Sequence, residues 1–439
     1  MSVDKNKKHS EYLNLLRTVR SASYPEIDLS KALYLDSLYA LDLNRTKVLK
    51  ALIRSLFFKV PELDIRIGNN PILMLTTIHA RNDHDSYWNS IKELFPVKDE
   101  VIFDNRFTVK EYLKNISLRG IAGRIRNYQR SYRALKVIDH KIHRSYLASK
   151  MITCEKYIDA VKDRIKDTKV VIVFCDTFLF ENALIQFMHH RGAVTITAQH
   201  GQPVFFGWEK DHLNQSQILN FSSDYYMAKG NYAKRQFIKA GFDEKKIVVL
   251  GSMNPAVSKS SGKTAENVFG VFTDCILYDF AGYTNRKLIE MAEAVSGRMN
   301  MSYFIKLHPS DTSPDYNCLV SHRCIGIYRH EYTNEELFGR IEFGIMSASA
   351  IYLDMLYASV KCYQMRTEIP FPLVESQADQ FESCEQITDK LCAWRRLSAV
   401  EKERYFTEQQ KEYGSCENTG RKIQDFVKSI TDRSNCQEE

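Results

Sequence analysis

The stretch VVIVFCDTFLFENALIQFMHHRGAVTIT, residues 170–197, decides the fold class of this chain. Residues 170–175 are apolar on both faces of an extended backbone, which is typical of a strand buried in a parallel sheet. Residues 181–190 have the apolar spacing of a helix, and residues 193–197 form a second β-branched run. A strand, a helix and a strand in this order predict the repeating unit of an α/β protein.

The same alternation continues on both sides of this stretch. Upstream we expect strands at 71–77 and 101–104 around a helix at 87–95, and downstream a strand or turn at 223–230, a helix at 231–240 and a strand at 246–252. A second series follows, with strands expected at 268–274, 302–307, 324–329, 342–346 and 361–365 and helices at 285–296, 333–339 and 349–358. The sequence therefore predicts two Rossmann-like domains facing a cleft, with ligands at the carboxyl ends of the strands.

The two series set the expected domain boundaries. These are a helical N-terminal appendage (1–65), a first Rossmann-like domain (66–255), a linker (256–266), a second Rossmann-like domain (267–398), and a C-terminal helix and tail (399–439). The linker is placed at AVSKSSGKTAE because this is the only Ser-, Gly- and Lys-rich polar stretch of the chain.

The composition excludes several classes of protein. The 439 residues, 44% hydrophobic and 12% aromatic, suffice for two or three domains with their own cores, which excludes a disordered or fibrous chain. None of the ten cysteines falls in a CxxC pair, so we expect reduced thiols and neither a disulfide framework nor a metal site. The N-terminus lacks the apolar stretch of a signal peptide and no run of 18 apolar residues occurs, so we expect a cytoplasmic protein, soluble or peripheral to the inner face of the plasma membrane.

The formal net charge of +7 is unevenly distributed. Residues 106–150 contain twelve Lys or Arg against two acidic residues, a net charge of +10, so the rest of the chain carries −3. Apolar residues at steps of three and four predict one long amphipathic helix with a cationic face in this segment. That face is either merely solvated or a surface for an anionic membrane or an anionic glycan. We expect no nucleic-acid partner, because the basic character is confined to one segment.

The candidate catalytic residues of the first domain follow its predicted strands. No Walker A, GxGxxG, HExxH or GxSxG motif occurs, which argues against P-loop ATPases, dinucleotide oxidoreductases, zincins and α/β-hydrolases. His200 follows the strand at 193–197, where an imidazole suits a general base, although an ordinary turn histidine is the alternative. Asp176 and Glu181 follow the preceding strand and either supply a second carboxylate or act as acids at a helix N-terminus.

The second domain offers two groups of polar residues at strand ends. In KLHPSD (306–311), Lys306 and His308 alternate onto one face, where both can point at an anion, and Pro309 fixes the turn. In the next group, Ser347 and Ser349 stand at a helix start, where hydroxyl and backbone donors suit a phosphate. The alternative is that Ser347 simply caps that helix. Together the two groups predict a nucleotide phosphate site.

The set HGQP (200–203), KLHPSD (306–311) and MSASAIYLD (346–354), in this order, resembles the GT-B glycosyltransferase superfamily. More narrowly it resembles the branch of CDP-glycerol glycerophosphotransferases, bacterial polysialyltransferases and capsule Kdo transferases. The resemblance implies the following roles: His308 and Pro309 contact the cytidine phosphate of the donor, Ser347 and Ser349 contact phosphate oxygens, Asp354 is the acid after the Ser-rich helix start, and His200 faces the acceptor. The chain departs from the polysialyltransferases at 175–177, Cys-Asp-Thr, where they carry a paired-acid motif, and from the glycerophosphotransferases at 204–206, Val-Phe-Phe, where a basic residue is usual.

The resulting hypothesis is an inverting, metal-independent transferase. It would move a sugar or polyol phosphate from a CMP- or CDP-linked donor to a growing bacterial surface polysaccharide of capsule, O-antigen or teichoic-acid type. The expected acceptor is a glycan or lipid-linked glycan, and no cofactor besides the nucleotide-activated donor is expected. A GT-B-like sugar-nucleotide epimerase and a non-enzymatic basic protein that binds membrane or nucleic acid remain the alternatives.

Overall fold

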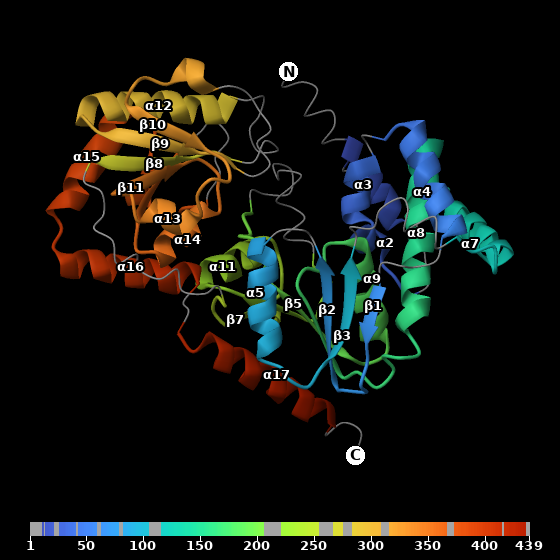
Figure 1. Ribbon diagram of the computed structural model, residues 1–439. Coiled ribbons are helices and arrows are strands. Elements are labelled where there is room, and N and C mark those ends of the chain that lie inside the picture. The colour runs from blue at the N-terminus through green and yellow to red at the C-terminus, as the bar shows by residue number, and fades with distance from the viewer. Residues whose placement is uncertain are drawn as a thin grey trace.

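The computed structural model describes residues 11–12, 14–21, 26–40, 43–58, 63–78, 82–104, 116–205, 221–253, 267–274, 283–308, 316–366, 373–414 and 417–435. The described chain forms two domains side by side, each built on a sheet covered by helices (Figure 1). The predicted α/β class with two Rossmann-like domains is confirmed. The predicted linker 256–266 lies outside the described residues, so the boundary between the domains stays a prediction.

The first domain is built on a seven-stranded sheet in the order β1-β3-β2-β4-β5-β6-β7. Its strands are β1 (Leu63–Arg66), β2 (Ile72–Ile78), β3 (Asp99–Asp104), β4 (Val170–Val173), β5 (Val194–Ala198), β6 (Tyr225–Ala228) and β7 (Ile247–Val249). All neighbours are parallel except β1 and β3, which pair antiparallel at the sheet edge. The connecting helices include α5 (Asn82–Glu93), α9 (Leu179–His190) and α11 (Asn231–Lys239). Strand β4 is fully buried, as its uninterrupted apolar sequence predicted.

The second domain is built on a six-stranded, wholly parallel sheet in the order β10-β9-β8-β11-β12-β13. Its strands are β8 (Val268–Phe272), β9 (Ser302–Lys306), β10 (Cys324–Tyr328), β11 (Phe343–Met346), β12 (Lys361–Met365) and β13 (Gln380–Phe381). Its helices are α12 (Tyr283–Met299), α13 (Asn334–Phe338), α14 (Ile351–Tyr357) and α15 (Cys384–Arg396). The chain order reverses between β8 and β11, so the topological switch point of this sheet lies there.

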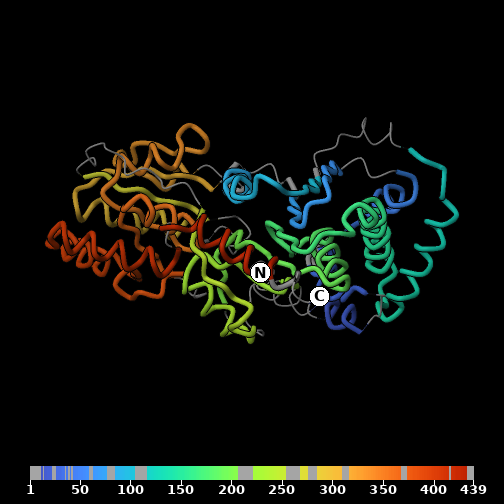
Figure 2. Tube along the Cα trace, turned by 90° about the horizontal axis from the view of Figure 1, so that it is seen from below, coloured from blue at the N-terminus to red at the C-terminus, as the bar shows by residue number. Residues whose placement is uncertain are grey.

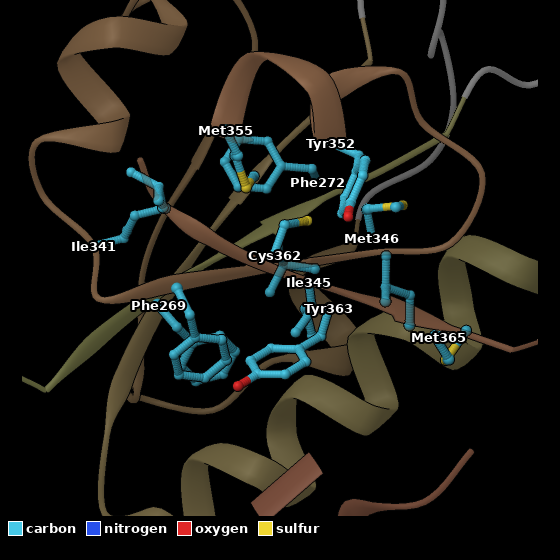
Figure 3. Close-up of a cluster of buried hydrophobic side chains, with 14 of the residues drawn as sticks. Phe269, Phe272, Ile341, Ile345, Met346, Tyr352, Met355, Cys362, Tyr363 and Met365 are labelled. Atoms are coloured by element: carbon cyan, nitrogen blue, oxygen red, sulfur yellow. The ribbon is translucent and has the colours of Figure 1, made fainter. Parts of the chain in front are cut away.

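The core of the second domain is aromatic and sulfur-rich. Phe269 of β8 stacks on Phe343 of β11 with ring centroids 5.0 Å apart, and Tyr363 of β12 packs edge-on against Phe343. Figure 3 shows Phe269 and Tyr363 in this core. On the other face, Met355 of α14 closes over Gly344, where an added Cβ would meet the methionine sulfur. These contacts fix β8, β11 and β12 side by side and so position the ends of all three strands.

The N-terminal stretch is helical but is not set apart from the first domain. The helices α2 (Leu29–Ala32), α3 (Tyr34–Ala40) and α4 (Arg45–Phe57) precede β1. Their apolar side chains share one buried cluster with α8 (Lys141–Val161), including Leu33, Val48 and Leu147. The predicted helical character of this stretch is therefore present, but its described helices are packed into the first domain rather than appended to it.

The basic segment forms two helices where one was predicted. The first is α7 (Ile121–Ala134), and after a break at 135–140 the chain continues as α8. The guanidinium of Arg144 donates to the carbonyls of Lys136 and Ile138 at 2.9 and 2.8 Å, and so satisfies acceptors left open at the break. The prediction of a single long helix over 106–150 is wrong for this reason. Residues 105–115 of the segment lie outside the described part of the chain.

The last described helix returns to the first domain. The single C-terminal helix predicted for this charged sequence is instead two helices, α16 (Ala399–Tyr413), at the second domain, and α17 (Thr419–Asn435). Helix α17 lies below the first domain in Figure 1 and in front of it in Figure 2, which is seen from below. Ile423, Val427 and Ile430 of α17 are buried in one cluster with Met74 and Trp88 of the first domain. Within the described residues, no helix has the length and apolar character needed to span a membrane.

Candidate functional site

The carboxyl edge of the second sheet collects polar residues from three strands. Thr273 and Asp274 follow β8, His308 follows β9, and Ser347 follows β11. Because the chain order reverses between β8 and β11, this edge is the place where open α/β sheets bind ligands. The structure thus brings two of the predicted donor-side residues, His308 and Ser347, to the switch point.

Two hydrogen-bonded pairs hold this edge together. The backbone N–H of His308 donates to the Thr273 hydroxyl at 2.9 Å, which ties the end of β9 to that of β8. The Ser347 hydroxyl donates to the carboxylate of Asp274, and the N–H of Ala348 donates to the same carboxylate at 2.9 Å. Asp274 and Ser347 are both buried, and a buried carboxylate requires such donors. Ser347 therefore fixes the turn after β11 to the end of β8.

The other predicted donor-side residues surround the start of α14. The helix begins at Ile351 without a side-chain cap, so the alternative interpretation of Ser347 as its capping residue is wrong. The hydroxyl of Ser349 accepts from the N–H of Ile351 at 3.4 Å, and the Asp354 carboxylate accepts from the Asn334 amide at 3.4 Å. Pro309 lies outside the described residues.

Lys306 is the last residue of β9, and its ammonium group donates hydrogen bonds to backbone carbonyls of the same chain. It donates to the carbonyls of Arg329 and Tyr332 at 2.8 and 2.9 Å. Burial lowers the pKa of Lys306, and the nearby carboxylate of Glu331 partly offsets this. Two of its three donors are thus engaged with the loop after β10. The Lys306 side chain therefore holds that loop in place. The alternation of Lys306 and His308 along the sequence does not predict this role.

His200 lies two residues beyond β5, at the carboxyl edge of the first sheet. Its Nε2 lies 3.5 Å from the sulfur of Cys175, which follows β4, and its ring packs edge-on against Phe174 at 5.9 Å. The hydroxyl oxygen of Thr177 lies 2.9 Å from the same sulfur. Burial raises the pKa of the Cys175 thiol, so the sulfur keeps its proton at neutral pH and can share it with the imidazole. These contacts hold the ring in one orientation.

The two predicted carboxylates of the first domain are buried. One oxygen of Asp176 accepts from the N–H groups of Ser222 and Ser223 and from the Ser223 hydroxyl, at 2.8 to 3.0 Å. Burial raises the pKa of Asp176, and these donors lower it in part. Glu181 lies in the first turn of α9, as the alternative interpretation had it, and burial raises its pKa to about 8. Asp176 therefore fixes the chain that leads into β6, and burial favours the protonated form of Glu181.

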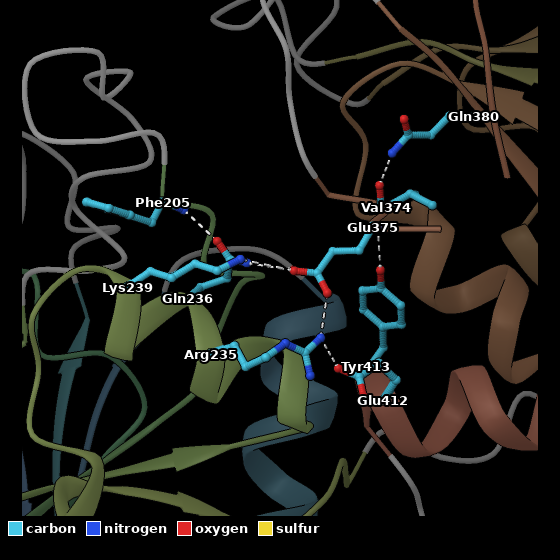
Figure 4. A network of polar contacts seen from close by, with 9 residues as sticks. All are labelled: Phe205, Arg235, Gln236, Lys239, Val374, Glu375, Gln380, Glu412 and Tyr413. Carbon is cyan, nitrogen blue, oxygen red and sulfur yellow. Dashed lines mark hydrogen bonds and ion pairs between the residues drawn. The ribbon is translucent and has the colours of Figure 1, made fainter. Parts of the chain in front are cut away.

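The turn that carries His200 reaches the second domain. Val204 is fully buried in the apolar cluster of that domain. The N–H of Phe205 donates to the amide oxygen of Gln236 on α11 at 3.0 Å, and the Gln236 amide donates in turn to Glu375 of the second domain at 3.3 Å (Figure 4). The carboxyl edge of the first sheet therefore borders the junction between the domains.

Glu375 is the centre of this junction. Its carboxylate accepts from Arg235 at 2.5 Å and from Lys239 at 3.4 Å, both on α11 (Figure 4). Arg235 also pairs with Glu412 near the end of α16, and the backbone N–H of Glu375 donates to the hydroxyl of Tyr413 at 3.1 Å. Residues from both domains thus share one network of charges and hydrogen bonds.

A hydrogen-bonded path connects this junction with the edge of the second sheet. The N–H of Val374 donates to the side-chain oxygen of Gln364 on β12 at 3.2 Å, and the Gln364 amide donates to the carbonyl of Ser347 at 2.5 Å. The turn of His200 and the turn of Ser347 are therefore fixed relative to each other through neighbouring residues. Such an arrangement can present an imidazole from one domain to a ligand held by the other. In the described part of the chain, no three His, Cys, Asp or Glu side chains are grouped so as to hold a metal ion.

Comparisons with known proteins bear on the fold. A scan against protein families and a search of curated proteins both find no match. Among solved structures, a Listeria monocytogenes protein assigned as a UDP-N-acetylglucosamine 2-epimerase superposes with a TM-score of 0.50 at 11% identity, covering 82% of this chain and 96% of that one. The chain has the GT-B fold.

Two further solved structures are similar. UDP-GlcNAc 2-epimerase from Neisseria meningitidis has a TM-score of 0.49 and 13% identity, over 82% of this chain and 99% of that one. The lipopolysaccharide outer core galactosyltransferase WaaB has a TM-score of 0.47 and 12% identity, over 82% of this chain and 99% of that one. At such identities the likeness concerns the architecture.

Several residues that shape the site of this GT-B chain were missed by sequence reasoning. Asp274 and Thr273 end a predicted strand, so the rule that selected His308 could also have selected them. Cys175 was grouped with the apolar core because it closes an uninterrupted apolar run. Nothing in the sequence singles out Gln364 or Glu375, because their roles depend on contacts between elements far apart in the chain.

Proposed function

We propose that this GT-B chain is an enzyme that acts on a nucleotide-activated sugar or polyol phosphate and transfers the activated group to an acceptor hydroxyl. The observation that carries the proposal is the gathering of Thr273, Asp274, His308 and Ser347 at the switch point of the second sheet, linked by hydrogen bonds to the turn of His200. Nucleotides bind at such points in open α/β sheets. A base from one domain and a donor held by the other are what a transfer reaction needs.

The proposed chemistry is a single displacement with inversion. For a sugar donor, an acceptor oxygen attacks the activated carbon, and the bond between that carbon and the nucleotide phosphate oxygen breaks. The proton of the acceptor hydroxyl passes to the imidazole of His200 as general base. Negative charge then develops on the departing nucleotide phosphate, where polar groups near His308 and Ser349 would stabilise it. No cofactor besides the donor enters this scheme.

Other residues of the two edges would act by positioning. The thiol of Cys175 contacts the His200 ring and would set its orientation. Asp274 and Ser347 hold the turn that faces the donor phosphate. Asp176 and Lys306, which were candidates for catalysis and phosphate binding, already bind backbone groups of the protein, and we assign them to support of the site.

The donor is proposed to be CMP- or CDP-linked, and the acceptor a glycan or lipid-linked glycan of a bacterial surface polysaccharide. Support for both comes from the resemblance of HGQP (200–203), KLHPSD (306–311) and MSASAIYLD (346–354) to the transferase branch. A second candidate is a sugar-nucleotide epimerase, which needs no acceptor. The Listeria monocytogenes protein that shares the fold, assigned as a UDP-N-acetylglucosamine 2-epimerase, favours it.

Donor binding is tested by thermal unfolding in the presence of CMP-, CDP-, UDP- and GDP-linked sugars. A ligand that binds only the native state raises the apparent melting temperature, so the matching donor should do so. His308→Ala should abolish most of this shift. The matched control is His322→Ala, an exposed histidine just before β10, at the opposite edge of the sheet. Equal shifts in both variants would place the nucleotide elsewhere.

Turnover separates the two candidate reactions. With donor and acceptor present, His200→Ala should lower the transfer rate by about 10²- to 10⁴-fold while leaving the donor-induced thermal shift in place. His190→Ala, at the exposed end of α9, serves as the control. Conversion of UDP-N-acetylhexosamine without any acceptor would instead support the epimerase and contradict the transferase.

A further inference from the structure

The outer end of the first domain exposes apolar side chains on two neighbouring elements. On α4, Leu49 is 55% exposed and Ile53 is 41% exposed. On the segment that leads into and through α7, Ile116, Leu118 and Ile125 are 50%, 67% and 40% exposed. We call the surface formed by these five residues the α4–α7 surface. It holds five of the ten large apolar residues that are exposed in the described part of the chain, and such gathering marks an interaction site.

The two elements are fixed to each other. Ile116 forms an isolated antiparallel bridge with Phe58, directly after α4, and the N–H of Ser117 donates to the carbonyl of Phe57 at 2.8 Å. The guanidinium of Arg124 reaches from α7 to the carbonyl of Leu56. The α4–α7 surface is therefore a built feature of the fold rather than the chance proximity of two helices.

The charge of these elements has one sign. Residues 45–58 and 116–134 together contain nine Lys or Arg and neither Asp nor Glu. Eight of the nine are exposed, and Lys47, Lys50, Arg119 and Arg126 lie within three residues of an exposed apolar residue in the sequence. Two cations of the basic segment are paired: Arg130 of α7 pairs with Glu155, and Lys150 of α8 lies 3.1 Å from Asp36. The exposed apolar side chains of the α4–α7 surface therefore lie among side chains of positive charge only.

This combination fits one kind of partner best. A soluble polyanion is bound by charge and gains little from exposed aliphatic side chains. An anionic bilayer attracts Lys and Arg at its headgroups and accepts aliphatic side chains at the boundary of its acyl region. Long Lys and Arg side chains can also reach back to the headgroups when neighbouring apolar residues insert. At a lipid surface, both parts of the α4–α7 surface therefore have a role.

We propose that the α4–α7 surface docks the protein on an anionic lipid bilayer. Figures 1 and 2 both place α7 at the end of the first domain that lies away from the second domain. Docking there covers neither the junction at Glu375 nor the carboxyl edge of the second sheet. The proposal is independent of the reaction: it specifies where the molecule meets a membrane, whichever sugar nucleotide it uses.

The test measures co-sedimentation of the full chain with vesicles of 70% phosphatidylcholine and 30% phosphatidylglycerol, and with pure phosphatidylcholine vesicles. The protein should bind the anionic vesicles, and binding should weaken as salt rises, because the attraction between charges at a surface is screened. Arg119→Gln/Arg126→Gln should lower the partition coefficient about thirtyfold. The matched control is Arg421→Gln/Lys428→Gln on α17, where both residues are exposed; it should bind as the parent does.

The apolar part is tested separately. Leu118→Ser/Ile125→Ser should lower the partition coefficient at least about tenfold. Ile325→Ser/Val400→Ser changes side chains of the second domain that are 54% and 75% exposed, and should have no effect. No binding of the parent to anionic vesicles, or equal binding to both vesicle types, would overturn the proposal. Full vesicle binding by the Leu118→Ser/Ile125→Ser variant, with displacement by dextran sulfate, would also overturn it in favour of a polyanion site.

Discussion

Asp274 is a buried carboxylate at the end of a strand. The hydrogen-bond donors around it determine how much its burial lowers the free energy of unfolding. Ser347→Ala removes the hydroxyl that donates to it and leaves the Ala348 N–H as a donor. Loss of one partner of a buried charged group destabilises a protein by about 1–3 kcal/mol. We therefore expect the free energy of unfolding, measured by urea denaturation, to fall by that amount in Ser347→Ala.

Ser349→Ala is the control for this substitution. Ser349 lies two residues further on and is only partly buried, and its hydroxyl accepts one long bond of 3.4 Å. Its removal should change the free energy of unfolding by less than about 0.5 kcal/mol. If both variants unfold at the same urea concentration as the parent, the contact between Ser347 and Asp274 does not stabilise this edge.

Individual residues were predictable where strand position alone decides their place. His200 and His308 were located because each follows a parallel strand, and the structure puts both at carboxyl edges. The engagement of Lys306 with the Arg329 carbonyl was not predictable, because the loop after β10 is remote in sequence. The same holds for Asp176, whose partners are Ser222 and Ser223. Side-chain chemistry indicates what a residue can bind, but the partner is set by packing.

At the scale of elements, Gly230 between β6 and α11 shows how closely the two domains approach. Its φ of −152° suits any residue, so space is its only constraint. An added Cβ would lie 2.5 Å from the carbonyl carbon of Tyr413, at the end of α16. Gly230→Ala must therefore push α16 away from α11, and such overpacking costs about 1–3 kcal/mol. We expect that loss in the free energy of unfolding, measured by chemical denaturation.

Gly297→Ala should raise the free energy of unfolding, whereas Gly230→Ala should lower it. Gly297 is exposed on α12, and nothing lies within 4 Å of the Cβ that alanine would add. Replacing a helical glycine by alanine stabilises by about 0.5–1 kcal/mol. A loss of stability of equal size in both variants would mean that the close approach of α16 to Gly230 is not what constrains that position.

Helices and strands were predictable from the sequence where apolar residues recur at a regular spacing or form an uninterrupted run. The central parallel strands of the sheets, such as β4 and β11, are fully buried, so their sequences stand out as apolar runs. Strand β1 (Leu63–Arg66) did not stand out, because it is a short edge strand with alternating exposure. The break between α7 and α8 was also missed, since Leu135, Ile138 and Ile142 keep a helical spacing across it. Arg144 stabilises that break by a contact that periodicity does not record.

At the scale of the whole molecule, α17 connects the end of the chain to the first domain. Ile423, Val427 and Ile430 are buried there, and the side chain of Gln424 donates to the carbonyl of Leu94 at 2.8 Å. We expect that a chain divided genetically within 256–266 and produced as two fragments will purify as a complex, because one fragment supplies a core helix of the other.

Val427→Asp in the second fragment should sharply reduce this co-purification, because a buried unpaired carboxylate is strongly disfavoured. Asp425→Asn, on the exposed side of α17, should leave the complex intact and serves as the control. Recovery of the fragments as separate, folded proteins would contradict the expectation. The measurement is affinity purification through a tag on the first fragment, followed by size-exclusion chromatography.

The position of α17 also bears on the order in which the molecule can be completed during synthesis. A ribosome releases the N-terminal residues first, and domains generally fold as units as they emerge. Here the apolar face that holds Met74 and Trp88 stays uncovered until Val427 and Ile430 have been made. The second sheet, by contrast, has all of its described strands once Phe381 has emerged. The domain that is translated first is therefore the one whose core is finished last, and in the interval its uncovered face is exposed to chaperones and proteases.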